Sequence, residues 1–227
     1  MSEQGKIQAI TLDAGGTLFE PWPSVGHVYA EVAASHGLPG IEPETLNARF
    51  AQAWRARESF NYTRGEWAAL VDHAFAGLSP TPPSQSFFPA VYERFVQPDV
   101  WHVFEDTRPA LDQLRTRRIR LGLISNWDER LRPLLTSLGL AKWFEVIVVS
   151  GEEGVHKPAP EIFRRAAERL GQPPSSILHV GDSREEDVNG ARRAGFQAVL
   201  LSRRPEADAQ PDAIQSLLEL MEKARGG

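Results

Sequence analysis

The sequence predicts an α/β fold, in which a Rossmann-like three-layer core with a mainly parallel sheet carries a small all-helical domain. Two observations lead to this prediction. From about residue 101 onward, short apolar runs alternate with amphipathic segments of helical period, an order that favours a parallel sheet with helices on both faces. Earlier in the chain, roughly 80 residues separate the first apolar run from the second, and they show helical periods without a convincing strand.

The first apolar run, residues 6–13, is expected to form the first strand of the sheet. Ile7, Ile10 and Leu12 make it apolar on both faces, as in strands that helices cover on each side. The run ends in Asp13, and a pair of glycines follows two residues later. A carboxylate at a strand end, followed by backbone that can approach an anion closely, predicts a ligand site at this point.

The insert between the first two strands is expected to be a helical bundle over residues 20–98. Gly37 is placed to end one helix, and Thr63 with Glu66 forms a capping box that begins another. Proline-rich and glycine-containing turns separate the segments, which suits a bundle of short helices. The expected helices span residues 25–36, 43–59, 63–77 and 86–96.

The remaining elements complete a discontinuous core domain made of residues 1–19 and 99–227. A stripe of leucines at spacings of three and four marks one helix, and Pro160 at a first helical position marks another. The expected helices span residues 107–117, 128–138, 160–170, 184–194 and 212–224. The expected strands span residues 119–124, 144–149, 177–180 and 196–201.

Composition excludes several classes of function. The net charge of −5 argues against a nucleic-acid surface as the main partner. No apolar stretch approaches the roughly 18 residues of a membrane span, and the polar N-terminus lacks a signal-peptide pattern, so a cytoplasmic protein without a membrane partner is expected. The chain has no cysteine, which excludes disulfides and thiolate chemistry and leaves oxygen or imidazole as metal ligands.

Polar residues also follow the later strands. Ser125 and Asn126 end the second strand with a hydroxyl and an amide, and Lys157 stands just ahead of a helix. Asp182 ends another strand after a glycine, and Asp187 follows near the start of the next helix. Because parallel strands bring their carboxyl ends to one edge of a sheet, these residues are expected to meet near Asp13.

These segments resemble the ordered motifs of the haloacid dehalogenase-like hydrolase superfamily. Residues 13–17 look like its first motif, Ser125 its second, Lys157 its third, and residues 181–187 its fourth. The match covers nearly the whole chain, and the helical insert at residues 20–98 is similar to the cap domain that the family inserts after its first motif.

The resemblance implies a Mg²⁺-dependent phosphoryl transfer on a small phosphorylated substrate, with Asp13 as the nucleophile. Asp13 and Asp182 would hold the metal ion with the main-chain carbonyl of Gly15. Asp187 would orient either Asp182 or Lys157. The phosphate-binding set would be Gly16, Thr17, Ser125, Asn126 and Lys157, and the catalytic pair Asp13 and Lys157.

Gly15 departs from the family pattern. Family phosphatases carry a second aspartate there, two residues after the nucleophile, and use it as general acid and base. Such a group contributes about 10² to 10⁴ in rate. Its loss would impair most the hydrolysis of alkyl phosphates, whose alkoxide leaves poorly.

Three interpretations of Gly15 stay open. The chain is a hydrolase limited to good leaving groups, or one that borrows an acid such as Glu20; alternatively it is a degenerate member that binds a phosphorylated ligand or a protein without turnover. A dehalogenase, with tyrosine in place of Gly15, is disfavoured by Asp182. The phosphonate-cleaving branch needs a cap lysine, and none occurs between Lys6 and Lys142. Trp127 either lines the pocket or packs under the cap.

Overall fold

The computed structural model describes residues 6–57, 60–203 and 213–223 and divides into two compact units. The first unit comprises Met1–Phe19, Val103–Trp127 and Gly139–Gly227. The second comprises Glu20–His102 and Asp128–Leu138. These units differ from the predicted domain ranges at residues 99–102 and 128–138, which lie in the helical unit.

Two sets of contacts explain the difference. Strand β2 (Phe19–Pro21) pairs with β3 (Trp101–Val103) in a two-stranded sheet that was not predicted from the sequence. Within the second unit, Arg130 Nη1 donates to the carbonyl of Tyr92 at 3.1 Å, and the Tyr92 hydroxyl donates to Glu129 at 2.9 Å. The assignment of the units as catalytic core and cap stays a prediction.

The first unit contains a five-stranded sheet in the order β5-β4-β1-β6-β7. Its neighbouring strands are all parallel, with Leu12 opposite both Leu123 and Val180. The strands are β1 (Ala9–Leu12), β4 (Arg120–Ser125), β5 (Val146–Val149), β6 (Ile177–Gly181) and β7 (Gln197–Leu200). The chain crosses from one side of β1 to the other between β5 and β6, so the ends of β1 and β6 form the switch point where α/β sheets bind ligands.

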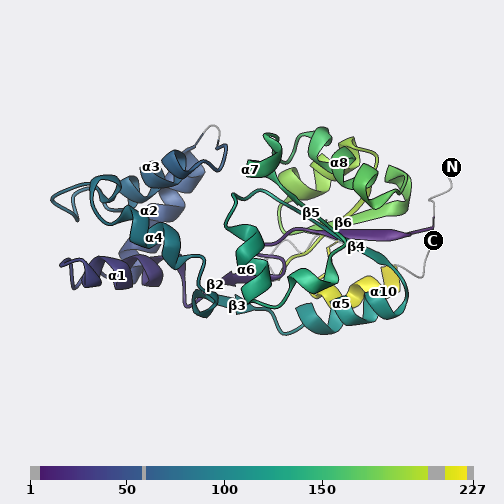
Figure 1. The fold of residues 1–227 in the computed structure, drawn as a ribbon, viewed down its shortest axis with the longest axis horizontal. Coiled ribbons are helices and arrows are strands. Elements are labelled where there is room, and N and C mark those ends of the chain that lie inside the picture. The colour runs from purple at the N-terminus through teal and green to yellow at the C-terminus, as the bar shows by residue number, and fades with distance from the viewer. Residues whose placement is uncertain (1–5, 58–59, 204–212, 224–227) are drawn as a thin grey trace. The chain divides into compact units, whose positions relative to one another are not determined.

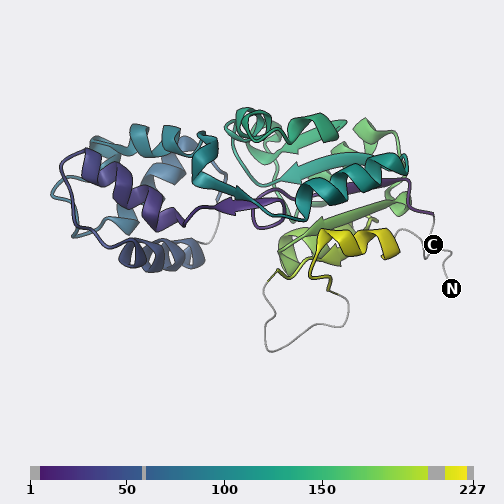
Figure 2. The same cartoon turned by 90° about the horizontal axis from the view of Figure 1, so that it is seen from below.

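Helices cover both faces of this sheet, which confirms the predicted α/β class (Figure 1). Helix α8 (Pro160–Leu170) packs Ile162, Phe163 and Ala166 with residues of β1, β4 and β5 in one apolar cluster. Helices α5 (Thr107–Thr116) and α10 (Leu220–Lys223) lie on the other face, onto which Figure 2 looks. The further helical elements of this unit are α7 (Ser150–Glu153), α9 (Gly190–Arg193), η3 (Ala141–Trp143), η4 (Pro174–Ser176) and η6 (Leu217–Glu219).

The segment after β6 differs from the predicted continuous helix over residues 184–194. It forms a π-helix, η5 (Arg184–Asn189), followed by the short helix α9. Ser183 begins η5, because its hydroxyl accepts from the N–H of Glu186 and its carbonyl accepts from Asp187 and Val188. Single π turns often occur at functional sites, and this one carries Asp187. The predicted terminal helix is shorter than expected, and residues 212 and 224 at its predicted ends lie outside the described ranges.

The second unit is mainly helical, as Figure 2 shows, and it buries a cluster rich in aromatic side chains. The predicted capping box is present: the Thr63 hydroxyl accepts from the N–H of Glu66, and the Glu66 carboxylate accepts from the N–H of Thr63. Tyr29 lies at the centre, with Phe75 among its ring contacts. The elements are α1 (Val25–Ser35), α2 (Pro43–Ala56), α3 (Arg64–Ala74), α4 (Phe88–Arg94), α6 (Leu131–Ser137), η1 (Pro83–Gln85) and η2 (Pro98–Val100). Among the residues described, no helix is both long and apolar enough to span a bilayer.

Candidate active site

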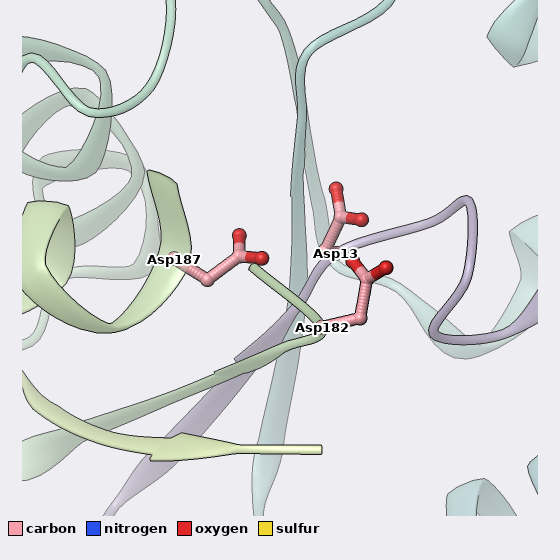
Figure 3. A group of neighbouring side chains, drawn as sticks. All are labelled: Asp13, Asp182 and Asp187. Atoms are coloured by element: carbon pink, nitrogen blue, oxygen red, sulfur yellow. The ribbon is translucent and has the colours of Figure 1, made fainter. Parts of the chain in front are cut away.

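Three aspartates from two strand ends and one helix converge at the carboxyl edge of the sheet (Figure 3). Asp13 follows β1, Asp182 follows β6, and Asp187 lies on η5. One carboxylate oxygen from each lies within 4.8 Å of the others. The strand order explains this placement, because β1 and β6 are adjacent and parallel and the N–H of Asp13 donates to the carbonyl of Val180 at 2.9 Å.

Asp13 is held by two donors on the same oxygen. Lys157 Nζ donates to Asp13 Oδ1 at 2.7 Å, and the Ser125 hydroxyl donates to the same atom at 2.9 Å. Asp13 is 7% exposed and Lys157 is 2% exposed. The structure therefore brings together the predicted nucleophile, the predicted cation and the predicted hydroxyl in one buried cluster, with the carboxylate fixed in one orientation.

Asp187 contacts Lys157, one of the two residues that it was expected to orient, and its role in orienting the lysine stays a prediction. Its Oδ1 accepts from Lys157 Nζ at 2.6 Å, and its Oδ2 accepts from the N–H of Ser183 at 2.9 Å. His179 Nε2 lies 3.1 Å from Oδ1, while His179 Nδ1 lies 2.9 Å from the Thr11 hydroxyl. This chain of hydrogen bonds through the centre of the sheet holds the ammonium against Asp13.

The charges in this cluster shift the pKa values in opposite directions. Burial alone would lower the pKa of Lys157, but the charges of Asp13 and Asp187 outweigh it and hold that pKa above its usual range. Burial alone would raise the pKa of Asp187, but Lys157 and the bonds from His179 hold it well below its usual value. Burial raises the pKa of Asp13, against the opposing charge of Lys157. The ammonium is thus permanently charged, and Asp13 depends on it to ionise.

Asp182 is the carboxylate of this cluster whose negative charge is least balanced by a positive one, because the ion pairs of Lys157 are with Asp13 and Asp187. Asp182 is exposed to solvent, yet desolvation of its carboxylate group raises its pKa to about 7, with repulsion from Asp13 and Asp187 as the next causes. Its carboxylate lies against the backbone of Gly16, where a Cβ atom would clash with Asp182 Oδ2. Gly16 is therefore needed both for this close approach and for its φ of 74°.

The three aspartates could hold a divalent metal ion. Carboxylate oxygens are the ligands that hard cations prefer, and the raised pKa of Asp182 indicates that the cluster lacks positive charge. Both oxygens of Asp187 already accept hydrogen bonds, Oδ1 from Lys157 and Oδ2 from the N–H of Ser183. On Asp13 the donors Lys157 and Ser125 share the one oxygen Oδ1, so Asp13 and Asp182 are the better placed pair, and their role as ligands stays a prediction. The carbonyl of Gly15 belongs to the turn after Asp13, and its role as a ligand stays a prediction.

Two of the predicted phosphate-binding residues lie in the turn after Asp13. The N–H of Gly16 donates to the carbonyl of Phe19 at 2.9 Å, so it closes the turn and any role of Gly16 rests on close backbone approach. Thr17 is buried, its carbonyl accepts from Arg203 Nε at 3.2 Å, and its hydroxyl has no hydrogen-bond partner among the described residues. An unpaired buried hydroxyl is unfavourable by itself and would be satisfied by a ligand oxygen.

Asn126 supports the lysine loop in this structure. Its Oδ1 accepts from the N–H of Lys157 at 2.7 Å, and its Nδ2 donates to the carbonyl of Lys157 and to Glu186 Oε2, both at 3.0 Å. Both amide hydrogens of the side chain are therefore already used. The predicted contact between this amide and a phosphate would require one of these bonds to break. The single hydroxyl hydrogen of Ser125 is likewise already donated to Asp13, whereas the ammonium of Lys157 has three hydrogens and donates to two carboxylates.

Trp127 occupies the space beside Gly15. A Cβ atom built on Gly15 would lie 3.0 Å from Trp127 Cζ3 and 3.7 Å from Cη2. The indole also packs edge-on against Phe19, with ring centroids 5.9 Å apart. Position 15 thus lacks a side chain, and part of the volume that one would fill belongs to the tryptophan.

Three contributors to this site were missed or left open in the prediction from sequence. His179 is a lone polar residue in an apolar strand, which was the one local indication of its hydrogen bonds to Thr11 and Asp187. The contact of Glu186 with Asn126 had no sign in the sequence, because acidic residues are common in the first turn of a helix. The contact between Trp127 and Gly15 joins residues far apart in the chain.

Comparisons with known proteins show which family this chain and its fold resemble. The model of the haloacid dehalogenase-like hydrolase family matches residues 7–195. The mouse haloacid dehalogenase-like hydrolase domain-containing protein 3 is 33% identical over 89% of this chain and 84% of its own, and the phosphoserine phosphatase of Thermus thermophilus is 34% identical over 86% and 74%. Two solved structures are similar across 97% of this chain. A HAD phosphatase from Thermococcus onnurineus is 27% identical, with a TM-score of 0.70 and 99% of its own chain covered. A 2-haloacid dehalogenase from Pseudomonas syringae is 25% identical, with a TM-score of 0.67 and 100% of its own chain covered.

The pKa shifts predict opposite effects of two isosteric substitutions on the metal-free chain. Asp187→Asn should lower the free energy of unfolding by about 3 kcal/mol at pH 7.5, because it breaks a buried ion pair with Lys157. The Asp187 carboxylate stabilises the fold above its unfolded pKa, near 4, and this contribution is lost as the pH falls below it. Asp182→Asn should raise the free energy of unfolding, because the raised folded pKa of Asp182 makes its charged form unfavourable as the pH rises from about 4 toward 7. This increase should be small, because solvent screens the charge of the exposed Asp182.

Urea unfolding in the presence of EDTA measures both variants. Glu161→Gln, at an exposed ion pair on α8, provides the matched control, with a change close to zero. Changes of the same sign for the two aspartate variants would contradict the charge balance described above.

Proposed function

Because the chain belongs to the haloacid dehalogenase-like hydrolase family, we propose that it is a Mg²⁺-dependent phosphatase that acts on a small phosphorylated metabolite through an aspartyl-phosphate on Asp13. The observation that carries this proposal is the double contact of Asp13 Oδ1 with Lys157 and Ser125. Two donors on one oxygen hold the carboxylate in place for attack on phosphorus, and a permanently charged ammonium offsets the charge that gathers there.

The chain's residues divide the work as follows. A carboxylate oxygen of Asp13 attacks phosphorus, the bond to the leaving oxygen breaks, and water later cleaves the aspartyl-phosphate. The Lys157 ammonium, which has a third hydrogen beyond its two carboxylate contacts, would stabilise the transferring oxygens, and the Thr17 hydroxyl would bind one of them. The Ser125 hydroxyl holds Asp13 before attack and would donate to a transferring oxygen only after it leaves Asp13. Asp187 acts by holding Lys157 in position. When bound to Asp13 and Asp182, Mg²⁺ would supply the positive charge that this cluster lacks.

The absence of a side chain at position 15 restricts the substrate. No carboxyl group at that position can protonate a leaving oxygen, and Trp127 fills part of the space. Good leaving groups depart as stable anions and do not need the acid. We therefore propose aryl and acyl phosphates as favoured substrates, ahead of sugar phosphates. Glu20 lies on β2 in the second unit, and a role as a borrowed acid stays a proposal.

A second candidate function is ligand binding without turnover. Gly15 favours it, because a glycine at this position provides no side chain that could act as the usual acid. The intact cluster of Asp13, Lys157 and Asp187 favours catalysis, since a buried ion pair with no task is a costly feature to keep. A dehalogenase remains the less favoured chemistry because Asp182 adds a metal-type carboxylate beside Asp13.

A phosphatase assay with and without Mg²⁺ tests the proposal. The chain should hydrolyse p-nitrophenyl phosphate and acetyl phosphate at least about 100-fold faster than glucose 6-phosphate, because a missing general acid costs about 10² to 10⁴ for a poor leaving group. EDTA should abolish the activity, and so should Asp13→Asn. Glu161→Gln, a carboxylate-to-amide change on the surface of α8, should behave as the wild type.

The outcomes separate the candidates. Activity that persists in Asp13→Asn would remove Asp13 as the nucleophile. Mg²⁺ binding by calorimetry without turnover of any substrate would favour the binding function.

A double-mutant cycle at positions 15 and 127 tests the role of the missing acid. Gly15→Asp alone should raise the turnover of glucose 6-phosphate little, because the new side chain meets the indole of Trp127. Gly15→Asp combined with Trp127→Ala should raise kcat/KM for this substrate at least about tenfold over Trp127→Ala alone, since the carboxyl then has room to act as an acid.

Circular dichroism and Mg²⁺ titration confirm that each variant folds and binds metal. A folded, metal-binding double variant without any gain would show that a missing acid is not what limits the reaction.

A further inference from the structure

The contact between Trp127 and Gly15 points to the kind of leaving group that this site accepts. Asp13 is two residues before Gly15, and Ser125, whose hydroxyl bonds Asp13, is two residues before Trp127. The segments 13–15 and 125–127 therefore both begin at the carboxylate of Asp13, and they come into contact again at Gly15 and Trp127. There, Cζ3 of the indole lies 3.0 Å from the point that a Cβ atom on Gly15 would occupy. An aromatic side chain thus lies close to the phosphoryl-transfer centre, within the first unit.

The main chain of Trp127 is held in place. Its N–H donates to the Ser150 hydroxyl at 3.0 Å, and its carbonyl accepts from that hydroxyl at 3.0 Å and from the N–H of Gly151 at 2.8 Å. Phe19, which is fully buried, packs against the ring at an interplanar angle of 66°. The indole is therefore a fixed surface, and it is only partly buried.

A fixed aromatic surface favours planar partners. Aromatic rings attract one another in offset or edge-to-face arrangements beyond the effect of buried area, by an amount that corresponds to about three- to tenfold in affinity. Leaving groups that depart without an acid include phenolates, carboxylates and enolates, and only some of these are aromatic. The missing acid at Gly15 and the indole of Trp127 are separate observations, and the aryl group satisfies both.

We propose that Trp127 determines specificity by contacting a planar aromatic leaving group, so that the preferred substrates are aryl phosphate monoesters. This inference rests on the proposed phosphatase function for the reaction. The binding preference itself can be measured without turnover.

The test compares two non-hydrolysable probes, phenylphosphonate and cyclohexylphosphonate, by calorimetry in the presence of Mg²⁺. The two probes share the phosphonate and have similar size, but only one is planar and aromatic. The wild-type chain should bind phenylphosphonate about three- to tenfold more tightly. Trp127→Leu should bring this ratio close to one, whereas Trp127→Phe, which keeps a ring, should retain most of it. Trp143→Phe, near the amino end of β5 and thus at the opposite edge of the sheet, is the matched control and should keep the full ratio.

Each outcome decides the inference. A wild-type ratio of one, an unchanged ratio in Trp127→Leu, or a failure of both probes to bind would overturn it. A ratio that depends on Trp127 in a chain without phosphatase activity would support the aromatic site while the proposed reaction fails. Hydrolysis of acetyl phosphate together with a wild-type ratio of one would overturn the aromatic site alone.

Discussion

The ammonium of Lys157 lies between Asp13 and Asp187, and the arrangement of the site depends on this buried interaction. Without a cation, carboxylates this close and this buried would repel one another and take up protons. The fold secures the interaction from several sides: adjacent parallel strands set Asp13 beside the end of β6, and a hydrogen-bond chain from Thr11 through His179 fixes Asp187. The ion pairs of Lys157 are with Asp13 and Asp187, and the carboxylates of these two residues and of Asp182 lie close enough together that they could hold a divalent metal ion.

Glycine at position 15 and tryptophan at position 127 form a matched pair. The glycine provides no acid side chain at position 15, and the indole of Trp127 lies where the first atom of such a side chain would come into close contact with it. The two features have one consequence for chemistry: they disfavour substrates that need protonation of the leaving group and favour substrates that present a stable planar anion. The missing acid at Gly15 thus occurs together with an aromatic surface, the indole of Trp127, close to Asp13, a combination that suits a working site for substrates with planar leaving groups.

The sequence could predict those parts of the fold and site that local patterns determine. Apolar runs ending in Asp13, Ser125 and Asp182 indicated the strands and the converging polar residues, because parallel strands share one carboxyl edge. Features that rest on contacts between distant residues could not be read in this way. The pairing of β2 with β3 involves three residues in each strand, too few for a period. The commitment of Asn126 to the backbone of Lys157 depends on how two loops meet, as does the packing of Trp127 on Gly15.

Chemical capture of the intermediate tests the central claim, that Asp13 is the nucleophile, most directly. The chain is mixed with p-nitrophenyl phosphate and Mg²⁺, quenched in acid within the first turnover, reduced with borohydride and mapped by peptide mass spectrometry. Borohydride converts an aspartyl-phosphate to homoserine and leaves free aspartate unchanged. The account predicts homoserine at position 13 and none in Asp13→Asn. Homoserine at another aspartate, or unmodified Asp13 in a chain that hydrolyses the substrate, would contradict it.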